Sequence, residues 1–300
     1  MKVHITGGGG FIGQGIYQGL RHQHDVSFSD VADVNVTARS SLEAHFGKLK
    51  PDAIIHLAGL MGAQGSKKDL FEYFSVNSVG VLNTLDAALR SGVKHFIFLS
   101  SLTVYGKNDP PLMAVNEDSR FNPLHTYASS KLIGEHFVRD YARFQGLNVV
   151  VLRPTIIPGN LAGEVNAINE FCTNILKDQP VVIFGQGSHQ REWLSLADLT
   201  QAVDHALAFV DRKAQTKADP KACVYEDFII SSGQPISMLD LANTCVRIIG
   251  RGSVVTVDKA SSQAFSLTSD ITKAKTLLGW RPADSVETLI QDVVKKIREK

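Results

Sequence analysis

Tyr127 and Lys131 are the residues whose types and spacing most directly predict catalysis in this sequence. They stand four positions apart in Tyr-Ala-Ser-Ser-Lys, so a helix places both side chains on one face. A free tyrosine has a pKa of about 10, which is too high for a base at neutral pH. A nearby ammonium group stabilises the phenolate and lowers that pKa, so the pair predicts a general acid–base.

A glycine-rich turn near the N-terminus predicts a site for a pyrophosphate. The apolar run Val3–Thr6 predicts a strand and leads directly into four glycines and then Phe-Ile-Gly. Glycine lets the backbone approach a phosphate without a Cβ in the way, and the N-terminus of the next helix attracts anions. A flexible glycine loop is the alternative, but the position between strand and helix favours a dinucleotide site. The predicted contacts are Gly7, Gly10, Phe11, Ile12 and Gly13.

An acidic residue at the end of the next predicted strand favours NAD over NADP. Asp30 follows the apolar run Val26–Ser29 and lies 17 residues beyond Gly13. A carboxylate there accepts hydrogen bonds from the ribose hydroxyls of NAD and repels the 2′-phosphate of NADP. A simple turn residue is the alternative interpretation of Asp30. We therefore expect NAD as the cofactor.

These patterns together resemble the extended short-chain dehydrogenases/reductases, and within them the NAD-dependent epimerase/dehydratase family. The N-terminal segment TGGGGFIG matches the extended-branch pattern TGGxGFIG. Ser100–Gly106 matches the family's S-S-x-x-V-Y-G segment, and Leu278–Pro282 matches an ending common in nucleotide-sugar epimerases and dehydratases. The resemblance covers nearly the whole chain and implies an NAD-dependent enzyme similar to nucleotide-sugar epimerases.

The resemblance also implies roles for individual residues. Ser101 matches the position that completes a catalytic trio with Tyr127 and Lys131, and Ser100 is the neighbouring alternative. Arg191 matches a position that holds the substrate diphosphate. Besides the glycine turn, the acidic residue and the tyrosine–lysine pair, the residues implied to contact the cofactor are Asn35, Leu57, Ala58, Gly59 and Asn77.

The residues around the trio restrict the reaction. Dehydratases of the family usually carry an Asp-Glu pair after the catalytic serine or threonine, whereas this chain has Leu102 and Thr103, so dehydration is disfavoured. The leading hypothesis is 4-epimerisation of a nucleotide sugar, or a related sugar oxidoreduction, by hydride transfer. Ile156 and the segment near Ala260 replace two diphosphate-binding groups of the family. An NAD-dependent dehydrogenase or reductase of a smaller sugar, sugar acid or hydroxy acid is therefore the alternative, and a non-catalytic NAD-binding regulator is a third.

Short apolar runs alternate with helical patterns in the first half of the chain, which predicts an α/β fold. We expect a Rossmann-type doubly wound parallel sheet with a smaller C-terminal substrate lobe. The NAD-binding domain is predicted over residues 1–154 and the substrate lobe mainly over 155–300, with segments near 192–210 and 225–232 returning to the first domain. The polar stretch Asp211–Lys221 is predicted to be an exposed loop, and Asp284 is predicted to begin the last helix.

Composition and charge disfavour several other classes of protein. The 300 residues carry a formal net charge of +1, which gives no basic footprint for nucleic acid, and no apolar run approaches the roughly 20 residues of a membrane helix. Cys172, Cys223 and Cys245 form neither a disulfide framework nor a metal-ligand pattern, which suits a reducing cytoplasm. We expect a cytoplasmic enzyme without a metal. By resemblance to the family's dimers, we also expect a homodimer formed by the helices after Val79 and Tyr127.

Overall fold

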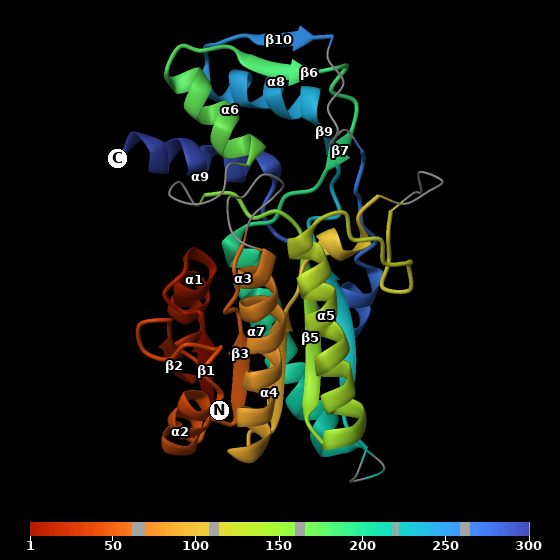
Figure 1. Ribbon diagram of the computed structural model, residues 1–300. Coiled ribbons are helices and arrows are strands. Elements are labelled where there is room, and N and C mark those ends of the chain that lie inside the picture. The colour runs from red at the N-terminus through yellow and green to blue at the C-terminus, as the bar shows by residue number, and fades with distance from the viewer. Residues whose placement is uncertain are drawn as a thin grey trace.

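A parallel β-sheet covered by helices forms the larger lobe, and a smaller lobe lies at one end of it (Figure 1). The computed structural model describes residues 1–61, 70–107, 114–159, 166–217, 219, 222–258 and 265–299.

Six strands form the sheet of the larger lobe in the order β2-β1-β3-β4-β5-β8, and every neighbouring pair is parallel. The strands are β1 (Lys2–Thr6), β2 (Asp25–Ser29), β3 (Ala53–His56), β4 (His95–Leu99), β5 (Asn148–Pro154) and β8 (Tyr225–Ile230). The chain runs outward from β1 to β2 and then crosses back to β3 on the other side of β1. Ligands of such folds bind at this switch point, beyond the carboxyl ends of the strands. The predicted Rossmann-type α/β fold is confirmed.

Helices cover both faces of the sheet because the strands are apolar on both sides. Successive strand residues point to opposite faces, so Ile54 packs into one helix layer and its neighbour Ile55 into the other. One face carries α1 (Phe11–Leu20) and α7 (Leu196–Thr216). The other face carries α2 (Arg39–Leu49), α4 (Gly80–Arg90) and α5 (Thr126–Asp140).

Short helical elements join or extend the main helices. The short helix α3 (Leu70–Phe74) and the π-helical turn η1 (Ser75–Val79) lead into α4, and the 3₁₀ turn η2 (Leu102–Tyr105) follows β4. Two further π-helical turns are η3 (Tyr141–Gln145), which extends α5, and η4 (Ala274–Leu278). The turns η1 and η2 both border the site described below.

The smaller lobe has its own apolar core. Its helices are α6 (Ala167–Leu176), α8 (Met238–Ile249) and α9 (Val286–Arg298). Its strands form two pairs, β6 (Val181–Phe184) with β10 (Val254–Val257) and β7 (Gln190–Arg191) with β9 (Ile236–Ser237). Phe171, Ile183 and Ile290 are among the buried side chains that hold this lobe together.

Two later segments of the chain belong physically to the larger lobe. Helix α7 covers the sheet, and β8 pairs with β5. Asp198 in α7 fixes the segment before α9: its carboxylate accepts hydrogen bonds from the N–H groups of Ala283 (2.9 Å) and Asp284 (3.2 Å). Its carbonyl oxygen accepts one from the indole of Trp280 at 3.0 Å. The division into domains at residue 154 stays a prediction.

Two local predictions differ from the structure. Helix α7 continues through Thr216, so most of the stretch expected to be a loop is the exposed end of a 21-residue helix. Its polar composition reflects solvent exposure rather than a loop. The last helix is capped by Ser285, whose side chain accepts a hydrogen bond from the N–H of Thr288, and not by Asp284. No helix in the described ranges is long and apolar enough to span a membrane.

Candidate active site

The glycine turn joins β1 to α1 in a conformation that side chains would prevent. Gly7 has a φ of +71°, and a Cβ there would lie 2.7 Å from the Cα of Ala58 in the loop after β3. A Cβ at Gly13 would lie 2.6 Å from the carbonyl oxygen of Gly7. Both distances are shorter than carbon atoms tolerate, so glycine is needed where the turn, the helix and the neighbouring loop meet.

The N-terminus of α1 offers free backbone donors beside this turn. Its N-cap is Gly10, no side chain of the helix caps it, and its first turn contains no acidic residue. A Cβ at Gly10 would meet only the carbonyl oxygen of Gly7, at 3.5 Å. The first N–H groups of a helix bind phosphate oxygens when no side chain occupies them. The predicted contacts at Phe11 and Ile12 lie in this first turn, so the turn fits a pyrophosphate.

Asp30 and Asn35 occupy the connection between β2 and α2. Asp30 is half-buried, and its Oδ1 accepts a hydrogen bond from the N–H of Val31 at 2.7 Å. Its Oδ2 lies over the glycine turn, 2.1 Å from where a Cβ on Gly9 would be. The amide of Asn35 is exposed and its oxygen accepts two hydrogen bonds from Thr37. Asp30 therefore fits a ribose next to the turn, whereas Asn35 stabilises its own loop.

Tyr127 and Lys131 lie one turn apart at the start of α5. Tyr127 is half-buried and stacks on His125, the N-cap residue, at 6.0 Å between ring centroids. Lys131 is only 5% exposed, and its Nζ lies 6.0 Å from the centroid of the Tyr127 ring. The ammonium group donates a hydrogen bond to the carbonyl oxygen of Leu99 at 2.9 Å. The structure thus brings the ammonium next to the tyrosine ring and fixes it to the end of β4.

The burial of Lys131 changes its protonation. Removal from water lowers the pKa of Lys131 to about 8, while the negative charge of Glu135 acts in the opposite direction. The lysine is therefore still mainly charged at neutral pH, but it loses its proton at a lower pH than an ordinary lysine does.

Ser101 and Ser100 point to different partners. Ser101 caps the turn η2, and its Oγ lies 2.9 Å from the Oγ1 of Thr103. Ser100 is 3% exposed and donates a hydrogen bond to the buried carboxylate of Glu135. The Ser100 hydroxyl is therefore occupied away from the trio. This geometry favours Ser101 as the third member and leaves Ser100 a structural partner of α5.

The loop after β3 is held by Asn77. The side-chain amide of Asn77 accepts a hydrogen bond from the N–H of Leu60 (2.7 Å) and donates one to its carbonyl oxygen (2.9 Å). It also donates to the Oγ of Ser130 in α5, at 3.0 Å. A Cβ on Gly59 would lie 3.4 Å from the Nζ of Lys131. The predicted cofactor segment Leu57–Gly59 therefore runs between the glycine turn and the lysine, and Asn77 acts by holding that loop.

His56 is a buried core histidine rather than a member of the trio. Its Nδ1 is 2.9 Å from the Oγ1 of Thr6, and its ring stacks on Phe96 and Phe98. Burial, together with the nearby charge of Lys131, lowers the pKa of His56 to about 3, so the ring is neutral.

Arg191 lies in the smaller lobe, in the short strand β7. Its guanidinium packs over the ring of Phe265 and donates hydrogen bonds to the carbonyl oxygens of Gln190 and Phe265. Burial lowers the pKa of Arg191 to about 10, which still leaves it charged at neutral pH. The predicted replacement near Ala260 lies outside the described residues.

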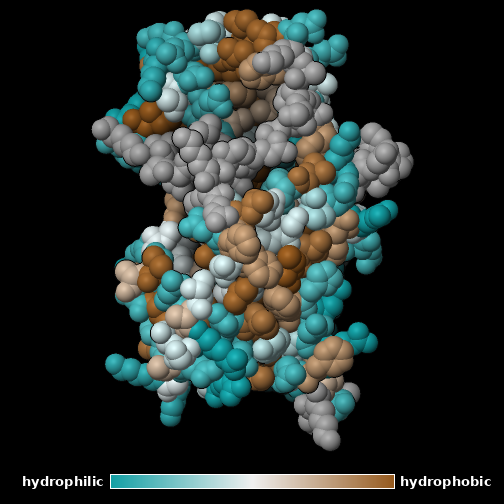
Figure 2. Space-filling model, in the orientation of Figure 1, coloured by the Kyte–Doolittle hydropathy of each residue, from teal (hydrophilic) through white to brown (hydrophobic). Residues whose placement is uncertain are grey.

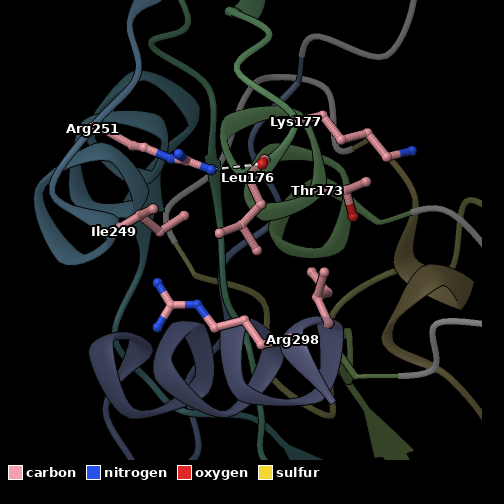
Figure 3. Close-up of a pocket in the computed structure, with 7 residues that line it drawn as sticks. Thr173, Leu176, Lys177, Ile249, Arg251 and Arg298 are labelled. Atoms are coloured by element: carbon pink, nitrogen blue, oxygen red, sulfur yellow. Dashed lines mark hydrogen bonds between the residues drawn. The ribbon is translucent and has the colours of Figure 1, made fainter. Parts of the chain in front are cut away.

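A cavity of about 550 Å³ in the smaller lobe is separate from these residues (Figure 3). Its three basic side chains, Lys177, Arg251 and Arg298, lie at or just beyond the carboxyl ends of α6, α8 and α9. Figure 3 shows Arg251 reaching the carbonyl oxygen of Leu176, at 2.7 Å. Cations at these positions balance the partial negative charge of helix ends, so the cavity needs no ligand to explain them.

Among the described residues, no cluster of His, Cys, Asp or Glu could hold a metal ion.

Sequence analysis did not find the buried carboxylate of Glu135 behind the trio. The spacing could have revealed Glu135, because it follows Lys131 by four residues and so lies on the same helix face. An acidic residue is rarely buried, as Glu135 is, without a partner.

Comparison with known proteins agrees with this geometry. Residues 3–218 match the model of the NAD dependent epimerase/dehydratase family. A putative UDP-glucose 4-epimerase of Methanocaldococcus jannaschii is 27% identical, with 97% of this chain and 96% of the relative covered. A UDP-glucuronate 4-epimerase of Thermodesulfobacterium geofontis is also 27% identical, with 89% of this chain and 78% of the relative covered.

A solved structure shows the same fold over the full length. The UDP-glucose 4-epimerase of Thermotoga maritima, determined with UDP-glucose, is 25% identical with a TM-score of 0.86, and 100% of this chain and 99% of that chain are covered. The prediction of an enzyme whose family depends on NAD is confirmed. The family match spans more than half of the chain, and the protein belongs to the NAD dependent epimerase/dehydratase family.

Proposed function

We propose that this protein is an NAD-dependent 4-epimerase of a nucleotide sugar, with Ser101, Tyr127 and Lys131 as its catalytic trio. The observation that carries the proposal is the contact of the Lys131 ammonium with the carbonyl oxygen of Leu99, two residues before Ser101. That contact gathers the tyrosine–lysine pair and the serine at the carboxyl end of β4, beside the loop that borders the glycine turn. The names of the relatives given above, a putative UDP-glucose 4-epimerase and a UDP-glucuronate 4-epimerase, support a UDP-sugar as the substrate here.

The trio divides the work of a reversible oxidation. The Ser101 hydroxyl holds the reacting sugar oxygen. The phenolate of Tyr127 takes the proton of the sugar 4-hydroxyl as carbon 4 is oxidised to a ketone. The Lys131 ammonium favours the ionised phenol by its charge. NAD, held by the glycine turn and Asp30, would supply reversible hydride transfer at carbon 4 of the sugar. Tyr127 then gives the proton back, so substrate and product have the same oxidation state.

The cofactor contacts follow from the same geometry. The N–H groups at the start of α1 bind the pyrophosphate, and Asp30 accepts hydrogen bonds from the adenosine ribose. The carboxylate repels a 2′-phosphate, so NAD is preferred to NADP. Arg191, still charged at neutral pH, is the proposed contact to the substrate diphosphate.

We also propose that the protein is a homodimer that works in the cytoplasm. Figure 2 shows apolar side chains gathered over α4 and α5. Phe74, Leu82 and Phe144, at or beside these helices, are 50%, 36% and 68% exposed, respectively. Large exposed apolar side chains in one region mark an association surface. Light scattering at micromolar concentration should give twice the chain mass, and a monomer would contradict the dimer.

Direct assay with sugar nucleotides tests the function. The purified protein is incubated with NAD and one UDP-sugar at a time, including UDP-glucose and UDP-glucuronate. The products of each reaction are separated by chromatography. The proposal predicts conversion of at least one UDP-sugar to its 4-epimer. Steady growth of absorbance at 340 nm without an epimer would instead indicate a dehydrogenase.

A further inference from the structure

A buried carboxylate lies directly behind the proposed trio. Glu135 follows Lys131 by four residues and Tyr127 by eight, so α5 presents all three on one face. The Glu135 side chain is 2% exposed. A carboxylate removed from water in this way requires hydrogen bonds and an opposite charge.

Arg153 and Ser100 supply those partners. Arg153, in β5, donates from Nε to Oε1 of Glu135 at 3.0 Å and from Nη2 to Oε2 at 2.8 Å. Ser100 donates its hydroxyl to the same Oε1. The third arm of the guanidinium, Nη1, donates to the phenol oxygen of Tyr105 at 2.7 Å. The segment that contains Ser101 is therefore held at both of its ends.

The sheet fixes Arg153 in turn. Arg153 is fully buried, and its Nη2 also donates to Asp227 in β8 at 2.7 Å. Asp227 receives a second hydrogen bond from the ammonium of Lys273 at 2.9 Å. Apart from its bonds to Glu135, the guanidinium is held by Asp227 in β8 and by Tyr105 after β4, and these contacts oppose its movement with a displaced helix. Its place is set by the sheet.

We propose that Glu135, anchored by Arg153, is a positioning residue that sets the place of Ser101 relative to Tyr127 and Lys131. The inference rests on the proposed function, because it assigns to Glu135 the alignment of that trio. Helix α5 carries two members and the end of β4 carries the third. The link from Glu135 to Ser100 joins these two elements immediately beside the reacting groups.

The charge of Glu135 gives the residue a second effect. Among the described residues, the titratable groups beside Lys131 are Tyr127, Glu135 on its own helix and the neutral His56 on β3. Its uncharged neighbours include the Phe98 ring and the carbonyl of Leu99. Loss of the negative charge therefore lowers the pKa of Lys131 below about 8. The positive charge of Arg153, then balanced by Asp227 without Glu135, would act in the same direction. A purely structural residue would not move this ionisation.

Three variants separate alignment from charge. Ser100→Ala removes one neutral donor, Glu135→Asp keeps the charge on a shorter arm, and Glu135→Gln removes the charge. Asp140→Asn is the matched control, since it removes an exposed carboxylate from the same helix. Glu135→Gln removes one of the two carboxylates paired with the buried Arg153 and leaves Asp227, so this variant can fail to fold. The other two variants decide the question in that case.

Kinetics and hydrogen exchange are measured on each folded variant. We expect Ser100→Ala and Glu135→Asp to lower kcat by about 10- to 100-fold with little change in KM, as small misplacements of reacting groups do. Both should keep the pH profile of the unchanged protein. Glu135→Gln should in addition move the alkaline limb, where Lys131 loses its proton, to lower pH. Asp140→Asn should change none of these.

Hydrogen exchange provides a readout that needs no substrate. Ser100→Ala and Glu135→Asp should speed the exchange of the backbone amides between Ser101 and Gly106, whereas the control should not. If the unchanged protein converts no UDP-sugar, the proposed function fails and the exchange rates alone decide the inference. The positioning role of Glu135 would be overturned if Ser100→Ala and Glu135→Asp left the exchange rates of these amides unchanged and, in an active protein, also left kcat unchanged.

Discussion

Replacement of Lys131 by methionine tests the electrostatic part of the mechanism. Methionine has nearly the length of lysine and fills a buried site without a charge. The side chain of Lys131 is 5% exposed, so the change removes the ammonium beside Tyr127 with little loss of packing. It also leaves the carbonyl oxygen of Leu99 without its donor, which costs about 1–3 kcal/mol of stability.

The expected loss of activity follows from the distance between the two groups. The Lys131 Nζ lies 6.0 Å from the centre of the Tyr127 ring. At that separation, with an effective dielectric constant of about 20, an ammonium and a phenolate attract each other by about 3 kcal/mol. Loss of this attraction lowers the fraction of ionised tyrosine at a given pH by roughly 100-fold. We therefore expect kcat near pH 7 to fall by about that factor.

The assay is the rate of UDP-sugar epimerisation between pH 6 and 10. In Lys131→Met, part of the activity should return at high pH, because hydroxide can then ionise the phenol. The unchanged protein should instead lose activity above about pH 8, where Lys131 gives up its proton. Lys94→Met, at an exposed lysine just before β4, is the control and should behave normally. A Lys131→Met protein with normal rate and normal pH profile would refute the reasoning.

Four further substitutions test the acid–base chemistry, the choice of cofactor and the stability of the fold. Tyr127→Phe should lower kcat by about 10²- to 10⁴-fold with cofactor binding kept, and Ser101→Ala should cost less, because the serine only orients and polarises; a reversed order in steady-state kinetics would argue against these roles. Calorimetric titration should show tighter binding of NAD than of NADP, and Asp30→Ala should narrow that gap; equal affinities at the start would exclude Asp30 as the selector. Asp198→Ala should lower the free energy of unfolding in urea by about 2–4 kcal/mol, because two backbone N–H groups lose their acceptor, and an unchanged midpoint would contradict that bond network.

Local patterns in the sequence predicted most of the fold and part of the site. The turn after β1 and the tyrosine–lysine spacing are each set within a few residues, so the sequence alone sufficed to propose them. The choice between Ser100 and Ser101 needed the family pattern, and the structure supplies a physical reason for it, since Glu135 occupies the Ser100 hydroxyl.

Long-range contacts could not be predicted in this way. The role of Arg153 does not follow from the sequence, because its partners Glu135 and Asp227 lie 18 and 74 residues away. The hydrogen bonds of the Asn77 amide to Leu60, 17 residues earlier in the chain, do not follow from the sequence either, and its contact with the cofactor stays a prediction. Such partners depend on which strands become neighbours, and no local periodicity contains that information.

Transfer of a labelled hydrogen tests the central claim most directly. UDP-glucose that carries deuterium on carbon 4 is incubated with the protein and NAD in ordinary water, and product and absorbance at 340 nm are followed together. The account predicts that UDP-galactose forms with the deuterium retained on carbon 4 and without net NADH. If another UDP-sugar is the active substrate, the same label on that sugar should be retained in its 4-epimer. Loss of the deuterium to water, or accumulation of NADH in step with substrate consumption, would contradict a hydride that leaves and returns within one site.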